Sequence, residues 1–275
     1  MVPDAFMLAP WILATLLGLV VGSFLNVVVH RLPLMLEREW QAANESLEET
    51  NPNFNLAVPA SHCPHCQTPL KLWHLFPVFS YVRLHGRCEF CQHPIGHLYP
   101  IIELATACAW TLCAWHWGAN LTGLSWALFA TILITLSVID WQTTLLPDDL
   151  TQALLWMGLL ASAGTWIPLS PTNSIWGAAV GYGSLWSVAT LFERFTGKQG
   201  MGAGDFKLLA ALGAWVGPLA LIPIVLFASL SGAMVGLYLK WTQRLNEEGH
   251  IPFGPFLAGA GMVVSIMGSP STLWM

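Results

Sequence analysis

The sequence predicts an all-α polytopic membrane protein of about eight transmembrane helices, with a small cytoplasmic zinc-binding module inserted between helices 1 and 2. The first observation is composition, since 55% of the 275 residues are hydrophobic and only 9% are charged. A soluble domain carries about 25% charged residues. The second is a series of apolar runs close to the length that crosses a bilayer. The third is one long polar stretch that holds four of the six cysteines.

The apolar runs predict the helices in chain order. The first covers about residues 8–29 and ends at His30 and Arg31. It lacks the basic start of a signal peptide and precedes an arginine, so we interpret it as a retained span. Seven more runs follow the polar stretch, at about 101–117, 122–139, 151–167, 174–192, 206–216, 219–239 and 253–267. The short run 206–216 predicts either a half-span or a helix packed inside the protein.

The distribution of charge predicts the orientation of these spans. With eight spans, all ten lysines and arginines fall on one side of the membrane. By the positive-inside rule this side is the cytoplasm, and both termini lie outside. The net charge of -5 provides no basic field, so nucleic acid is not predicted as a partner. The apolar runs predict the lipid bilayer as a partner.

Two pairs of cysteines in the polar stretch predict a metal site. Cys63 and Cys66 form one C-x2-C pair, and Cys88 and Cys91 form a second. Each pair can present two thiolates from a tight turn, and zinc suits a closed set of four. The alternatives are disulfides, which a cytoplasmic location disfavours, and redox-active pairs, which would not occur twice around a basic hairpin. The sequence therefore predicts one structural zinc.

Two aspartates at the ends of apolar runs are candidates for catalysis. Asp205 follows Gly202 and Gly204 and precedes an apolar run, where an acid is costly and marks a candidate functional site. A helix N-cap is the alternative interpretation of Asp205. Asp140 ends the third span and is expected at the same depth. Of two carboxylates held close together, one keeps a proton, so the pair can activate water and polarise a carbonyl.

Other charged residues near these ends have simpler interpretations. Asp148 and Asp149 follow a proline and precede an apolar run, which favours helix capping. Glu103 begins the second span. Its position is explained by helix capping or by packing against the polar stretch that holds the two cysteine pairs, called the cysteine module below. A role of Glu103 in a second activity is the weaker alternative. Lys207 either lowers the pKa of a nearby carboxylate or marks the membrane boundary, and we favour the boundary.

Together these motifs resemble the type IV prepilin peptidases, which are bifunctional leader peptidase and N-methyltransferase enzymes of the GxGD aspartyl protease class. The resemblance runs nearly end to end. One departure is His74-Leu75-Phe76-Pro77, where many members have Asn-Ile-Pro. The matching motifs lie at residues 22–33, both cysteine pairs, 86–88, 99–104, Asp140, 145–151, 200–207 and 251–256.

The resemblance implies a reaction and its residues. The enzyme would cleave the short basic leader of prepilins and pseudopilins at the cytoplasmic membrane boundary, after a glycine. It would then methylate the new N-terminal residue, usually phenylalanine, with S-adenosylmethionine as methyl donor. In the pattern of the family the catalytic pair falls on Asp140 and Asp205. Gly202 and Gly204 would let the protein backbone approach the scissile bond. No residues are predicted for the S-adenosylmethionine site.

The resemblance also implies an organisation and a location. Residues 1–30 would form the first transmembrane helix, residues 31–100 a cytoplasmic zinc-binding domain associated with methyl transfer, and residues 101–275 the transmembrane peptidase core. The protein would lie in the bacterial inner membrane, with its active site and zinc module on the cytoplasmic side. Two alternatives remain: a general intramembrane GxGD protease that cuts within spans, and a non-catalytic membrane scaffold or transporter with a zinc knuckle.

Overall fold

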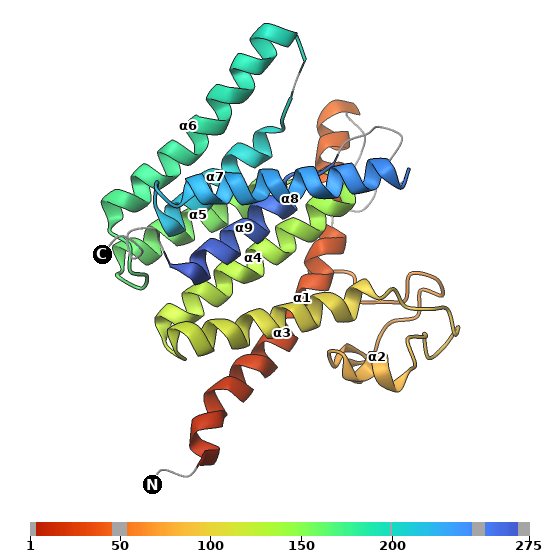
Figure 1. Ribbon diagram of the computed structural model, residues 1–275. Coiled ribbons are helices and arrows are strands. Elements are labelled where there is room, and N and C mark those ends of the chain that lie inside the picture. Colours follow the sequence, from red (N-terminus) through yellow and green to blue (C-terminus); the bar gives the residue numbers. More distant parts are fainter. Residues whose placement is uncertain (1–3, 46–53, 199, 244–250, 269–275) are drawn as a thin grey trace. The chain divides into compact units, whose positions relative to one another are not determined.

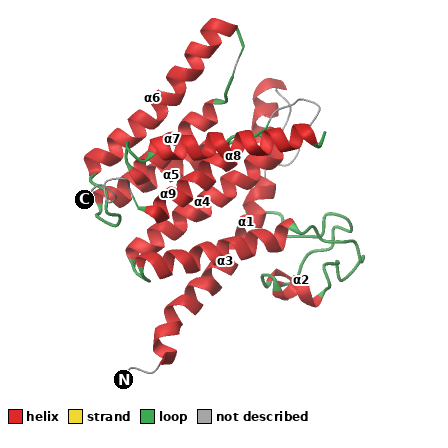
Figure 2. Cartoon of the chain, viewed as in Figure 1, coloured by secondary structure: helices red, strands yellow, loops and turns green. Residues whose placement is uncertain are grey.

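The structure, a computed structural model, describes residues 4–45, 54–198, 200–243 and 251–268. Within these ranges the regular structure is helical, and two isolated β-bridges are the extended pairings (Figure 2). The chain forms two compact units, Met1–Thr135 and Leu136–Met275, and the fourth α-helix runs from the first into the second. The two units are described separately below.

Each of the eight predicted apolar runs coincides with one helix, although the run at 151–167 extends four residues past the end of its helix. The helices are α1 (Asp4–Glu45), α3 (Leu98–Trp117), α4 (Leu121–Thr143), α5 (Asp148–Ala163), α6 (Pro171–Thr196), α7 (Ala203–Val216), α8 (Leu221–Trp241) and α9 (Gly254–Met267). Among the described residues, five of these helices are long and apolar enough to cross a membrane, namely α1, α3, α4, α6 and α8. The prediction of an all-α, multi-pass membrane protein is confirmed.

In the first unit, α1 and α3 pack against each other through glycines. A Cβ atom built on Gly18 would lie 2.7 Å from the Cα of Ala107, and one built on Gly22 would lie 2.7 Å from the Cα of Glu103. Small residues four positions apart let membrane helices approach to backbone contact. Because the two contacts run in opposite directions along the chain, the helices are antiparallel (Figure 1).

The cysteine module lies between α1 and α3 and consists mostly of turns and loops (Figure 2). Its two short helices are η1 (Leu72–Leu75), a 3-10 helix, and α2 (Phe79–Arg83). Arg31, buried in α1, donates hydrogen bonds to the carbonyl groups of Asn55, Leu56 and Pro59. The charged end of the predicted first span therefore holds the chain that leads into the module.

In the second unit, α7 is the central helix. Its residues from Asp205 to Val216 are buried with the exception of Lys207, and it packs against α5, α6, α8 and α9. The indole of Trp215 donates to the carbonyl of Leu154 in α5 at 2.8 Å, and Ser174 of α6 donates to the carbonyl of Ala214 at 2.6 Å. Of the two interpretations of this short apolar run, a helix packed inside the protein is confirmed.

Candidate active site and metal centre

Asp140 and Asp205 are brought together in the second unit. Asp140 lies in the last turn of α4 and Asp205 in the first turn of α7, and the two residues are only 4% and 8% exposed. Leu146 adjoins both positions. A Cβ atom built on Gly204, next to Asp205, would lie 2.7 Å from the Cβ of this leucine, and one built on Gly254, whose N–H is bonded to Asp140, would lie 3.1 Å from its Cδ2. Two acids that the sequence places at the ends of separate helices therefore form one buried pair.

Asp205 does not cap its helix. The N-cap of α7 is Gly202, which has an extended backbone and makes no side-chain capping hydrogen bond. Within the described ranges, no donor forms a hydrogen bond with the Asp205 carboxylate. The capping interpretation of Asp205 is therefore wrong, and its burial has no structural compensation of that kind. An acid that is mostly buried at the end of an apolar helix is costly, so the position is one where function is expected.

A backbone amide from a third helix holds Asp140. The N–H of Gly254, the first residue of α9, donates to Oδ2 of Asp140 at 2.9 Å. The amino end of a helix also favours negative charge. A Cβ atom built on Gly254 would lie 2.6 Å from the same Oδ2 atom. The sequence indicated residues 251–256 only as part of the family pattern, and no side-chain pattern could have identified a backbone donor.

The two glycines before Asp205 have different surroundings. A Cβ atom built on Gly204 would lie 2.7 Å from the Cβ of Leu146, so this glycine is needed for the contact between the start of α7 and the chain before α5. A Cβ atom built on Gly202 would meet no atom within 4 Å. The chain beside Gly202 is therefore open, whereas Gly204 is closely packed.

Asp148 and Lys207 form an ion pair that the sequence analysis missed. Nζ of Lys207 donates to Oδ1 and Oδ2 of Asp148 at 2.6 and 2.7 Å, which links α7 to α5. The N-cap of α5 is Pro147, so the prediction that Asp148 caps this helix is wrong. Asp148 and Asp149 do lie in its first turn, where the helix dipole favours acids. Lys207, which the sequence analysis interpreted as a marker of the membrane boundary, thus also has a partner in the structure.

The four cysteines of the first unit form one cluster. Their Sγ atoms all lie within 4.8 Å of one another, and those of Cys63 and Cys91 are 3.9 Å apart. A zinc ion with Zn–S bonds of about 2.3 Å needs sulfur atoms about 3.8 Å apart. All four residues are free thiols. The cluster can hold a metal ion, and its donor set and size fit zinc.

The two cysteine pairs share one turn geometry. The N–H of Gln67 donates to the carbonyl of Cys63 at 2.8 Å, and the N–H of Gln92 donates to that of Cys88 at 3.0 Å. Both glutamines have a positive φ, of 56° and 57°. In the first turn, the hydrogen bond between Thr68 and the thiol lowers the pKa of Cys66 to about 6. At Cys66 this favours the thiolate, which is the form that binds metal, whereas the neighbouring thiols help to raise the pKa of Cys91 to about 11.

Glu103 links the membrane helices to the cysteine module. Its buried carboxylate accepts a hydrogen bond from the N–H of Val78 at 2.7 Å and a longer one from Nδ2 of Asn26 at 3.4 Å. The residue lies beyond the first turn of α3, so it is not a cap. The prediction that Glu103 packs against the module is confirmed.

His74, at the departure from the family pattern, is bonded within the module. Its Nε2 atom lies 2.5 Å from Oε2 of Glu89, and its Nδ1 atom accepts from the N–H of Lys71 at 3.3 Å. The histidine therefore connects η1 to the turn that carries the second cysteine pair.

Comparison with known proteins identifies the family. The model of the bacterial peptidase A24 N-terminal domain matches residues 16–117, and that of the type IV leader peptidase family matches residues 127–237. The chain is 44% identical to a prepilin leader peptidase/N-methyltransferase of Stutzerimonas stutzeri, over 98% of this chain and 93% of that protein. The chain belongs to the type IV leader peptidase family.

Other members are equally similar. Proteins with the same name from Pseudomonas putida and Pseudomonas aeruginosa are each 45% identical to the chain. The first match covers 93% of this chain and 90% of the relative, and the second covers 98% and 93%. No solved structure gives a significant match. The leader peptidase match includes Asp140 and Asp205 and ends before Gly254.

Proposed function

We propose that this protein is a membrane aspartic endopeptidase and N-methyltransferase. It cleaves the short basic leader of prepilins and pseudopilins at the cytoplasmic boundary of the inner membrane, then methylates the new N-terminal residue, usually phenylalanine. The observation that carries the proposal is the buried pair formed by Asp140 and Asp205 at the ends of two helices. The names of the relatives support the same substrate class and both reactions.

We assign the roles of the two acids in cleavage from their different hydrogen bonding. Asp140 accepts the N–H of Gly254, and a hydrogen bond donated to a carboxylate favours its ionised form. Asp140 therefore takes a proton from the attacking water. Asp205, which has no such donor among the described residues, carries the proton that passes to the carbonyl oxygen of the scissile bond. When the tetrahedral intermediate collapses, the proton held by Asp140 passes to the leaving amine and Asp205 recovers its own.

The start of α7 provides room for an extended substrate. We assign backbone approach to Gly202, because the space beside its Cα is open. Gly204 acts less directly, since its contact with Leu146 sets where α7 begins and hence where Asp205 lies. A side chain at either glycine would change the space or the position next to the reacting carbonyl.

We assign methyl transfer to the domain formed by residues 31–100, with the peptidase core in residues 101–275. S-adenosylmethionine supplies the methyl group, and the amine released by cleavage is the nucleophile. Cys63, Cys66, Cys88 and Cys91 would hold one structural zinc ion, which would stabilise the fold of this domain. We also propose that the module and the acid pair face the cytoplasm, as the distribution of lysine and arginine predicts.

Incubation of the purified protein with a prepilin and methyl-labelled S-adenosylmethionine tests both reactions. Sequencing of the product should show cleavage after the glycine that ends the leader and a labelled methyl group on the new N-terminus. Cleavage deep within the apolar span of the substrate would instead support a general intramembrane protease and overturn the proposal.

The non-catalytic alternative makes a separate prediction. If the protein is a scaffold or transporter, Asp140→Asn and Asp205→Asn will leave prepilin processing intact. We expect each to lower prepilin processing by about 10²- to 10⁴-fold in protein that still inserts into the membrane. Asp149→Asn is the matched control, because Asp149 is an exposed acid in the first turn of α5.

A further inference from the structure

One segment of the cysteine module presents apolar side chains outward. In η1, α2 and the turn that joins them, Trp73, Phe76, Phe79 and Val82 are 56%, 62%, 65% and 66% exposed. Between Lys71 and Arg83 the chain contains no Lys, Arg, Asp or Glu. Contiguous apolar surface of this kind on a small module marks a binding surface for a partner or a membrane.

The backbone of this segment is bonded to the two membrane helices of the first unit. Oγ of Ser23 in α1 donates to the carbonyl of Leu75 at 3.4 Å. The N–H of Val78 donates to Oε2 of Glu103 in α3 at 2.7 Å. The turn between η1 and α2 therefore lies directly against both helices.

The positions of these two contacts indicate how deep the turn lies. The apolar run at residues 8–29 of α1 measures roughly 33 Å, close to the hydrocarbon thickness of about 30 Å, so His30 marks its boundary. Ser23 precedes His30 by about two helical turns, roughly 10 Å inside that boundary. In α3 the apolar run begins at about residue 101, so Glu103 lies roughly 3 Å inside it. Both contacts therefore fall inside the apolar runs of their helices, Ser23 deeper and Glu103 near the start of its run.

Most polar groups of the turn's backbone are bonded within the protein, as a nonpolar medium favours. No water is available there, so irregular backbone must find partners within the protein. The carbonyl groups of Leu75, Phe76, Pro77 and Val78 all accept hydrogen bonds. Pro77 has no N–H, and the N–H of Val78 is bonded to Glu103. The polar residues of α1 and α3 thus supply partners that water would supply in solution.

Cationic side chains stand at both ends of the segment. Lys71 precedes η1 and Arg83 ends α2, and both are exposed. Nζ of Lys71 lies 5.2 Å from the centre of the Trp73 ring. Long cationic side chains can lay their stems along apolar surface and reach lipid phosphates with their charges. The charge pattern therefore fits a lipid surface.

We propose that residues 71–83 form a re-entrant wedge in the membrane leaflet that adjoins the cysteine module. Trp73, Phe76, Phe79 and Val82 face the acyl chains, and Lys71 and Arg83 bind the phosphate groups of the lipid. Ser23 and Glu103 anchor the turn at this depth. The wedge makes the cysteine module a membrane-embedded part of the protein, whichever reaction the module serves.

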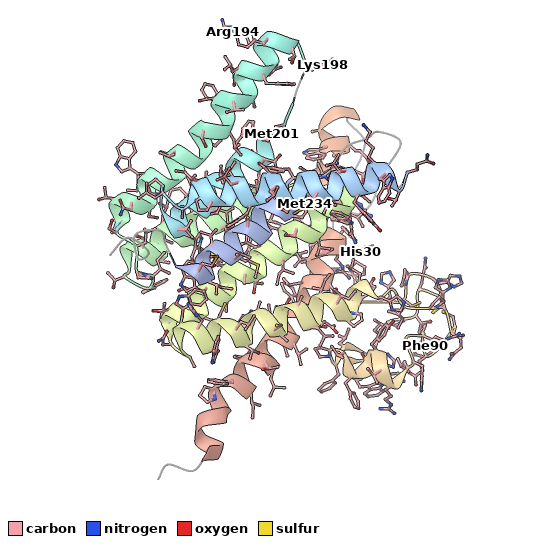
Figure 3. The ribbon with its side chains drawn as sticks, in the orientation of Figure 1. His30, Phe90, Arg194, Lys198, Met201 and Met234 are labelled. Atoms are coloured by element: carbon pink, nitrogen blue, oxygen red, sulfur yellow. The ribbon has the colours of Figure 1, made fainter. Side chains whose placement is uncertain are left out.

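A fluorine label tests the location of the wedge. Phe79 is replaced with trifluoromethyl-phenylalanine in the full-length protein, which is placed in nanodiscs of phosphatidylethanolamine and phosphatidylglycerol. Fluorine relaxation is measured with dissolved oxygen, which concentrates in acyl chains, and with a nickel chelate, which stays in water. Matched labels replace Phe24 of α1, which is 53% exposed, and Phe90 in the turn of the second cysteine pair, which is 45% exposed and lies edge-on to the ring of His74 (Figure 3).

We expect the label at Phe79 to respond as the label at Phe24 does, with strong relaxation by oxygen and weak relaxation by the chelate. The label at Phe90 should respond more strongly to the chelate. Relaxation of the Phe79 label by the chelate as strong as that at Phe90 would overturn the proposal. Protection from both agents would also overturn it, because a protein surface would then cover the segment.

A pair of variants tests the anchor separately. Glu103→Gln keeps an oxygen acceptor for the N–H of Val78, whereas Glu103→Leu removes it. We expect the leucine variant to increase relaxation of the Phe79 label by the chelate and the glutamine variant to leave it near the wild-type value. The Phe24 label in each variant reports whether α1 is still inserted. An unchanged Phe79 label in an inserted Glu103→Leu protein would refute the anchoring role.

Discussion

The cysteine cluster and the aspartate pair are assembled from different parts of the chain. The cluster comes from two short turns of similar geometry within one module. The pair comes from the ends of α4 and α7, and its backbone donor, Gly254, is 114 residues from Asp140 along the chain. One site is therefore assembled mainly by local turns, and the other depends on how distant helices pack.

The two regions also differ in what holds them together. Helix α2 of the module contains no buried residue, whereas nearly every residue of α7 is buried. A region with little core needs a ligand or another surface for its stability, and a helix surrounded by others is held by packing. We therefore expect the module to depend on a bound metal ion and on the membrane, and the acid pair to be open to chemical change without loss of its scaffold.

Loss of either acid should give the largest effect and test that conclusion directly. We expect Asp140→Asn and Asp205→Asn to lower the rate of prepilin cleavage by about 10²- to 10⁴-fold, the usual contribution of general acid–base catalysis. The thermal unfolding temperature should not fall, because a buried carboxylate costs free energy in the folded state. Initial rates and unfolding curves measure both. If either variant unfolds instead, the scaffold depends on its acids and the comparison fails.

Loss of one cysteine of the cluster should affect metal binding and folding of the cysteine module. We expect Cys63→Ser to reduce zinc content from about one ion per chain to near none, and to unfold the module with loss of methylation. Cleavage should be reduced far less than by Asp140→Asn. Metal analysis and assays of both reactions measure this. Cys108→Ser is the control, since Cys108 is an exposed residue of α3 outside the cluster.

Equal loss of cleavage in Cys63→Ser and Asp140→Asn would contradict the separation of the two regions. It would mean that the folding of the module determines the geometry of the acid pair.

A smaller effect is expected when the backbone donor is displaced. In Gly254→Ala the added Cβ lies too close to Oδ2 of Asp140, so the carboxylate must move. Misplacement of a catalytic group by about 1 Å can lower the rate about 100-fold. We expect kcat to fall by about 10- to 100-fold with little change in KM. Steady-state kinetics with a prepilin would show this.

Gly259→Ala is the matched control in the same helix, because a Cβ atom at Gly259 would meet no atom within 4 Å. Similar kinetics for the two alanine variants would show that Gly254 does not position Asp140.

The smallest effect is expected at the ion pair between α5 and α7. An exposed pair of this kind contributes about 0.2–1 kcal/mol, and salt screens it. We expect Lys207→Met to lower the free energy of unfolding by that amount, less at high salt, with near-normal cleavage. A double-mutant cycle with Asp148→Asn isolates the interaction. A large loss of cleavage without loss of stability would show that Lys207 acts on Asp205 instead.

Much of the molecule follows from the sequence alone. The eight apolar runs predicted the helices, because the energetic cost of charge in lipid is visible as hydropathy within each segment. The cysteine cluster was predicted because a C-x2-C turn brings its two thiolates together locally. Asp140 and Asp205 were predicted to lie at the same depth, because both are at helix ends on one predicted face, but the sequence did not show that they meet.

Only the tertiary structure revealed the remaining contacts. The donor to Asp140 is the backbone of Gly254, and a backbone N–H is present in nearly every residue, so the sequence cannot show which one is used. Asp148 was predicted to be a cap because its neighbours suit one, yet the packing of α5 beside α7 offers it Lys207. Local patterns determine helices and turns, whereas the burial and pairing of their ends depend on which helices become neighbours.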